Sequence, residues 1–159
     1  MLQGKVAGVS KLKLKCKDSS TRDSVTLDEI AQGAACCEPP HPVTAALFCQ
    51  AMGYLAEEGN VACDELATAG GIPVIVQFFA RFPDDKQVMN AAFRALITLS
   101  TLSDKPAKAT LPTIIANVRA HPTHIGYEFL LKHMHHYRTA FFECEGGAEV
   151  YGIAVSYKA

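Results

Sequence analysis

The sequence predicts an all-α protein in which a unit of about 40 residues recurs. The first observation is the stretch 70–100, GGIPVIVQFFARFPDDKQVMNAAFRALITLS, in which apolar residues return with a helical period on both sides of a short polar turn. The second is that the pattern returns further along the chain. Pro73 pairs with Pro112 and Pro83 with Pro122, both 39 residues apart (112 − 73 and 122 − 83). The third is that hydrophobic residues make up 49% of the 159 residues, enough for the core of one folded domain.

Local breaks and caps define the two helices of this central stretch. The glycine pair at 70–71 interrupts the preceding segment, and Pro73 suits the first turn of a helix, where its missing N–H would be unpaired anyway. Pro83 ends the first helix. Asp84 and Asp85 then offer side-chain oxygens to the free N–H groups of the second helix.

The central stretch resembles one unit of the armadillo repeat family. It has, in the same order, a GGIP-type start, a helix, a turn and a longer helix with an AA…AL..L pattern. Upstream, AMGYLA at 51–56 pairs with ALITLS at 95–100 (95 − 51 = 44), and downstream the glycine pair at 146–147 resembles the pair at 70–71. The resemblance implies a short, right-handed helical solenoid of about two to three repeats. We expect this armadillo-like repeat domain over residues 26–159, preceded by a basic and polar extension over residues 1–25.

The other expected helices follow from the same periodicity and from caps and breakers. Thr26 is a typical N-cap, and the prolines at 39, 40 and 42 end the helix that it starts. The expected ranges are 26–37, 43–56, 61–69, 111–120, 123–137, 138–144 and 148–157. The last of them, VYGIAVSY at 150–157, is rich in β-branched and aromatic residues, so an extended conformation stays open there.

The N-terminal extension carries a strictly alternating run, KLKLKCK. In an extended strand it would place Lys11, Lys13, Lys15 and Lys17 on one face. Because no second strong strand signal is near, we expect an extended basic arm, either a partly ordered tail or an arm that lies on a partner. Residues 1–17 carry charge +5, residues 18–65 carry −8 and residues 66–159 carry +2, which sum to the net charge of −1. We do not expect nucleic acid as a partner, because aromatic residues are not interleaved with the lysines and the rest of the chain is not basic.

Membrane insertion and secretion are not expected from this sequence. Charged or polar residues interrupt every apolar run, and the first residues lack the apolar core of a secretory signal. The six cysteines form no C-x-x-C pair, so we interpret them as reduced thiols. This indicates a reducing compartment, the cytoplasm or the interior of an organelle, with the mitochondrion left open.

No catalytic or cofactor motif is present. The sequence contains no G-x-S-x-G, P-loop, G-x-G-x-x-G or H-E-x-x-H pattern, so we expect neither enzymatic activity nor a cofactor. His133 and His136 are one helical turn apart and could seat a metal, but no third ligand is positioned by the sequence. We therefore expect no metal site. The alternative is that these histidines interact with the negative end of a helix dipole.

The resemblance also predicts a groove, because the longer third helices of armadillo units line a concave face. In register, this face holds three pairs of residues spaced i, i+4: Gln50 and Tyr54, Arg94 and Thr98, His133 and Tyr137. The chain has no Trp and none of these residues is Asn, which departs from the family's pattern for clamping a peptide backbone. Tyr and Arg are nonetheless enriched at protein interfaces. Ordinary solvated surface residues are the alternative.

We expect the last apolar segment to associate with another molecule. Repeat arrays need polar caps at their ends, whereas Val150, Tyr151, Ile153 and Val155 would leave an exposed apolar end. We therefore expect a noncatalytic protein–protein interaction scaffold, a structural or accessory subunit of a larger multiprotein assembly. Peripheral contact with a membrane complex stays open. The alternative function is a soluble armadillo-type adaptor that binds an extended peptide in its concave groove.

Overall fold

The computed structural model describes residues 1–58, 70–102, 111–112, 114–116, 118–120, 122–133 and 138–158. All regular secondary structure in these ranges is helical, which confirms the all-α prediction. The elements are α1 (Leu2–Lys17), the 3₁₀ turn η1 (Arg22–Ser24), α2 (Leu27–Cys36), α3 (Pro42–Glu58), α5 (Gly71–Arg81), α6 (Lys86–Leu102), α8 (His124–His133), α9 (Arg138–Glu143) and α10 (Gly147–Lys158). The pieces 111–112, 114–116 and 118–120 are also helical. The helix expected at 61–69 lies outside the described residues.

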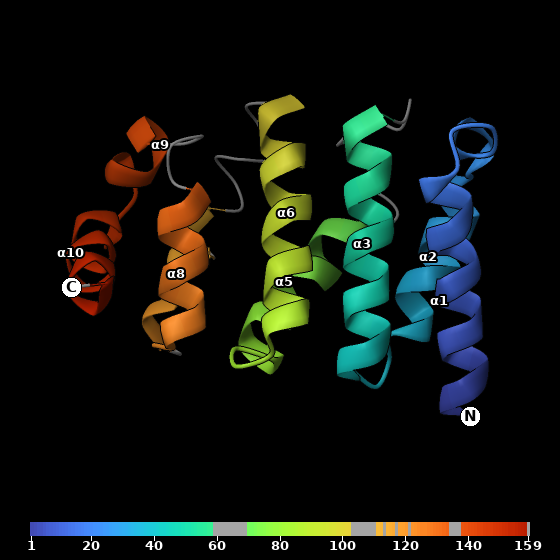
Figure 1. The fold of residues 1–159 in the computed structure, drawn as a ribbon, viewed down its shortest axis with the longest axis horizontal. Helices are drawn as coiled ribbons and strands as arrows, with labels where there is room; N and C mark the ends of the chain where they lie inside the picture. The colour runs from blue at the N-terminus through green and yellow to red at the C-terminus, as the bar shows by residue number, and fades with distance from the viewer. Residues whose placement is uncertain are drawn as a thin grey trace.

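Four helices stand side by side in one row, in chain order along the longest dimension of the molecule (Figure 1). Contacts join α1 to α3, α3 to α6 and α6 to α8. The four begin at residues 2, 42, 86 and 124, so successive starts are 40, 44 and 38 residues apart (42 − 2, 86 − 42, 124 − 86). Helices α2 and α5 lie behind this row and contact each other, and α9 and α10 lie at the end opposite to α1 (Figure 1).

The core runs along the row, and α3 is its most enclosed helix. Phe48 and Leu55 are completely buried and Met52 nearly so, because α1 covers one side of α3 and α6 the other. From the second layer, α5 contributes Ile75 and Phe78, which are also buried. A helix between two neighbours needs apolar residues on more than one side, and the sequence of α3, VTAALFCQAMGYLA, meets this need.

Capping groups fix the helix starts that the sequence predicts. Thr26 and Glu29 form a capping box at α2, in which the Glu29 N–H donates to Thr26 Oγ1 at 3.2 Å and the Thr26 N–H to Glu29 Oε2 at 2.8 Å. Asp85 caps α6 by accepting the Val88 N–H at 3.0 Å. These contacts satisfy backbone donors that a helix leaves unpaired at its first turn.

The two glycine pairs adopt the same conformation. Gly70 precedes α5 with φ 79° and Gly146 precedes α10 with φ 81°, a left-handed geometry that favours glycine. Their carbonyls accept the N–H groups of Val74 at 3.4 Å and of Val150 at 3.0 Å. Residues 76 positions apart (146 − 70) therefore open α5 and α10 in the same way.

A hydrogen bond joins the two proline-containing turns that the sequence pairs. The Thr123 hydroxyl donates to the Pro83 carbonyl at 3.0 Å, and Thr123 Oγ1 accepts the Gly126 N–H at 3.0 Å. One side chain thus caps α8 and ties its start to the turn between α5 and α6.

The expectation of an extended basic arm, separate from the helical domain, is wrong. Residues 2–17 form α1, whose buried residues Val9, Leu12 and Cys16 lie on one stripe and pack into the common core. The alternation of lysine and leucine has a period of two, but the contacts with α3 and α2 select the helical stripe. The buried Arg22 side chain donates to the Lys17 carbonyl at 2.8 Å, which satisfies a free group at the end of α1.

The segment over residues 148–157, for which an extended conformation was open, is helical as the main part of α10. The helix expected over 138–144 is α9, and α8 begins one residue after the expected start at 123. The expected end of α8 at 137 lies outside the described residues.

Candidate interaction surfaces

A small hollow between α3 and α6 brings together three of the six residues predicted to line a groove. Gln50, Tyr54 and Arg94 line it with Cys49, Gly53 and Ala91, around a volume of about 40 Å³. Gln50 Oε1 is buried and accepts no hydrogen bond within the described part of the chain. A buried acceptor without a partner is costly, so the Gln50 amide is a destabilising feature of this hollow.

The other predicted groove residues are only partly located. Thr98 lies on α6 and His133 ends α8, and Tyr137 lies outside the described residues. Among the residues that the structure describes, no three His, Cys, Asp or Glu side chains are grouped closely enough to hold a metal ion. None of the described helices combines the length and the apolar character needed to cross a membrane.

The four residues predicted to form an exposed end lie on α10. Val150 is 1% exposed, because it faces inward on the same stripe as Ala154, and its prediction as an exposed residue is wrong. Tyr151 is half-buried, whereas Ile153 is 37% and Val155 44% exposed. Sequence reasoning missed Phe142 and Tyr157, which are also exposed and belong to the runs FFE and VSY.

Helix α10, like α3, carries apolar residues on several sides, but fewer of its sides are covered. Tyr157 packs on Tyr127 of α8 with ring centroids 4.8 Å apart, and Tyr151 meets Phe142 of α9 at 5.3 Å. Beyond these contacts with α8 and α9, Ile153 and Val155 are exposed on two different sides of the helix. Apolar residues on several sides of a helix are typical of a position with more than one neighbour.

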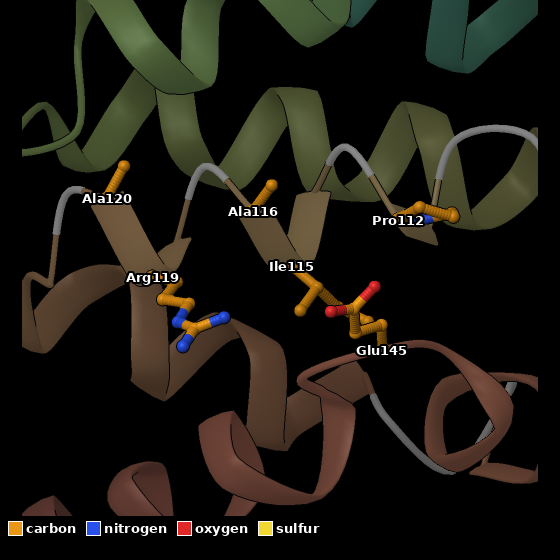
Figure 2. Close-up of a pocket in the computed structure, with 6 residues that line it drawn as sticks. All are labelled: Pro112, Ile115, Ala116, Arg119, Ala120 and Glu145. Carbon is orange, nitrogen blue, oxygen red and sulfur yellow. The ribbon is translucent and has the colours of Figure 1, made fainter.

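A larger hollow lies beside the start of α10 (Figure 2). Its volume is about 370 Å³, and it is lined by Pro112, Ile115, Ala116, Arg119, Ala120 and Glu145. We call it the Ile115 hollow. Aliphatic groups form most of its surface, and Figure 2 shows the Glu145 carboxylate beside Ile115. Its size falls in the range of small-ligand pockets.

The two charged residues of the Ile115 hollow differ in their pairing. Arg119 Nη2 lies 3.2 Å from Glu149 Oε2 of α10, so its charge is balanced within the chain. Glu145 is exposed and has no ion-pair partner among the described residues. The rim of the hollow therefore carries an uncompensated negative charge. Sequence reasoning gave no signal of this hollow, because it forms only where the helical pieces at 111–120 meet the α9–α10 junction.

The lysines of α1 also divide into two groups. Lys15 pairs with Glu29 at 2.7 Å and lowers the pKa of that carboxyl, and Lys5 donates to the Glu38 carbonyl. These two residues hold α1 on α2 and on the turn after it. Lys11 and Lys17 are exposed, and their ammonium groups make no hydrogen bond or ion pair with any described residue. They are available to a partner.

The cysteine thiols of the core are unreactive by burial. Desolvation raises the pKa of Cys16 and of Cys37 to about 12, and it raises the pKa of Cys49 well above its ordinary value. Such thiols remain protonated at neutral pH and pack as small apolar groups. Cys36 and Cys144 are half-buried.

No protein-family model matches the chain, and no curated protein or solved structure matches it. The fold by itself defines an all-α protein with helices in a row and a second layer behind it (Figure 1). Its candidate sites are surfaces of contact: an apolar helix face, two hollows and a pair of free lysines.

Proposed function

We propose that this chain is a noncatalytic protein–protein interaction scaffold, a structural or accessory subunit of a larger multiprotein assembly. The observation that carries the proposal is the exposure of large apolar side chains on α10, where Ile153, Val155 and Tyr157 are 37%, 44% and 50% exposed. A partner that covers these side chains would give them the apolar environment that they fit.

The free energy gained by covering these side chains indicates how large the contact with a partner must be. Fully burying one such side chain stabilises by about 2 kcal/mol, so covering these three residues and Phe142, which is 40% exposed, contributes about 3–4 kcal/mol. Association costs about 4–15 kcal/mol in lost translational and rotational freedom. The apolar face of α10 therefore cannot hold a partner alone, and a stable subunit contact must extend over neighbouring surface such as α9 and the Ile115 hollow.

We further propose that the architecture is a short armadillo-like solenoid. Three features support this interpretation: the spacing of 38 to 44 residues between the helices of the row, the equal conformations of Gly70 and Gly146, and the hydrogen bond from Thr123 to Pro83. In such an array each unit buries its apolar face against its neighbours, and terminal faces stay available for other molecules.

Cross-linking mass spectrometry of the native assembly, with wild-type chain and two variants, tests the proposed function. Ile153→Asp places a charge on the outer face of α10 and should abolish cross-links between α10 and other subunits. Val43→Asp places the same charge on an exposed apolar position at the start of α3, away from α10, and should retain them. Both variants should melt close to the wild type, because the substituted side chains reach solvent. Retained partners in Ile153→Asp would contradict the proposal.

The second candidate function, an adaptor that binds an extended peptide, rests on a different observation. Gln50 Oε1 is a buried acceptor without a hydrogen bond from any described residue, and Tyr54 and Arg94 lie beside it. An N–H of a bound peptide would satisfy this acceptor, whose burial unpaired costs about 1–3 kcal/mol.

The adaptor makes its own predictions. Arg94→Ala and Tyr54→Ala should weaken capture of the peptide without unfolding the chain. Gln50→Met removes the acceptor, so the free chain should become more stable while peptide binding is lost. If these changes leave partner binding unchanged and Ile153→Asp removes it, the subunit function is supported and the adaptor is excluded.

A further inference from the structure

We propose that Leu14 of one copy docks into the Ile115 hollow of a second copy, so that the chain associates with itself head to tail. This inference rests on the proposed function and names one partner of the assembly as another copy of this chain.

The docking group is the outer side of α1. Leu14 is 66% exposed, an unusual exposure for a leucine, and lies on the side of α1 opposite to the buried stripe of Val9, Leu12 and Cys16. Lys11 and Lys17 precede and follow it by three residues, so both ammonium groups flank the leucine. The result is an apolar side chain between two cations that no described residue neutralises.

The receiving surface is complementary in chemistry. The floor of the Ile115 hollow is aliphatic, from Pro112, Ile115, Ala116 and Ala120, and a volume of about 370 Å³ accepts a leucine side chain. Its rim holds Glu145 (Figure 2), which is unpaired within the described ranges. Arg119 is neutralised by Glu149. A lysine of α1 beside Glu145 would pair the uncompensated charges of the two surfaces.

The position of the two surfaces fixes the kind of association. Helix α1 and the α9–α10 junction lie at opposite ends of the long dimension (Figure 1). Two different surfaces that bind each other give a heterologous contact, which continues into a chain of copies unless it closes into a ring. A symmetric contact through Leu14 on both copies would instead bring Lys11 and Lys17 against their own equivalents, which is electrostatically unfavourable.

Sedimentation velocity of the purified chain over a concentration series at low salt tests the inference. The wild type should form species larger than a dimer. Leu14→Asp and Ala116→Glu should each sediment as a monomer of 17.1 kDa, because each loses one of the two surfaces. Both changes are at exposed positions, so both variants should fold. Val43→Asp, at an exposed apolar position outside both surfaces, is the matched control and should associate like the wild type.

Mixing the two monomeric variants gives the decisive result. Leu14→Asp keeps an intact hollow and Ala116→Glu keeps an intact Leu14, so an equimolar mixture should form a dimer and nothing larger. Raising the salt concentration should weaken it several-fold, because lysine–glutamate contacts at a surface are screened.

Three results would overturn the inference: a wild type that stays monomeric at all concentrations, association that survives Leu14→Asp, or a mixture that stays monomeric. Association of Ala116→Glu on its own would indicate a symmetric contact through Leu14 and would overturn the inference as well. The proposed function fails separately, through retention of the other subunits by Ile153→Asp in the native assembly.

Discussion

Removing the Thr123 hydroxyl tests whether the two proline-containing turns are physically coupled. In Thr123→Ala, α8 loses its N-cap bond from the Gly126 N–H, and the Pro83 carbonyl loses its donor. The cap contributes about 1 kcal/mol and the hydrogen bond to the carbonyl about 1 kcal/mol. The expected loss is therefore about 2 kcal/mol of unfolding free energy.

Thr26→Ala is the matched control, since Thr26 accepts the Glu29 N–H at the start of α2 and does not bond to another turn. It should cost about 1 kcal/mol. For a chain of this length, one kcal/mol lowers Tm by about 2–4 °C, so we expect a decrease of about 4–8 °C for Thr123→Ala and about 2–4 °C for Thr26→Ala. Thr123→Ser keeps the hydroxyl and should stay near the wild type.

Thermal and urea denaturation followed by far-UV circular dichroism measure these differences. Equal losses in the two alanine variants would refute the reasoning, because they would show that Thr123 acts as an ordinary cap and that its bond to the Pro83 carbonyl contributes nothing. A Thr123→Ser variant as unstable as Thr123→Ala would refute it as well.

Three further predictions concern local chemistry. Gly147→Ala should lower the unfolding free energy by about 1–3 kcal/mol, because the added Cβ would lie 2.0 Å from a carbonyl oxygen of α9. Gly152 lies in open space on the same helix, so the control Gly152→Ala should be neutral or stabilising by up to about 1 kcal/mol. The pKa of Glu29 is lowered from its ordinary value of 4.5, first by the hydrogen bond from the α1 lysine and then by the N–H at the start of α2. The ionised carboxylate therefore stabilises the fold above pH 4.5, and this stabilisation is lost as the pH falls. Glu29→Gln should therefore reduce the dependence of Tm on pH below about pH 5, and an unchanged acid profile would contradict this. Iodoacetamide at about pH 8 should label Cys36 well before Cys37, whose pKa burial raises to about 12; peptide mapping that finds equal labelling of the two neighbours would disprove it.

The helices of the central stretch could be predicted because their limits are set by local chemistry. The left-handed conformation of Gly70, the fixed φ of Pro73 and the side-chain oxygen of Asp85 act within a few residues of their own position. The capping box of Thr26 and Glu29 is local in the same way. Such signals remain in the sequence whatever the rest of the chain does.

The candidate surfaces could be predicted from the sequence only in part. Gln50, Tyr54 and Arg94 were placed on one face from the armadillo resemblance and the i, i+4 spacing, and the structure brings them to one hollow. Whether Gln50 Oε1 finds a hydrogen-bond donor depends on which groups of α6 pack against α3. The sequence pattern does not predict those contacts. Ile153 and Val150 are both apolar residues of one helix, and only the docking of α8 and α9 decides that the second is buried and the first exposed.

The sequence by itself determined that this protein is helical, where most of its helices begin and how far apart similar elements recur. The tertiary structure alone decided that residues 2–17 form a helix, because an alternating run of lysine and leucine fits a strand face until Val9, Leu12 and Cys16 find a partner in α3. It also decided that a hollow forms beside Ile115 and that α10 keeps an uncovered face. The physical reason is that caps and breakers act through neighbouring backbone groups, whereas burial and surface shape arise from residues that the chain brings together from distant positions.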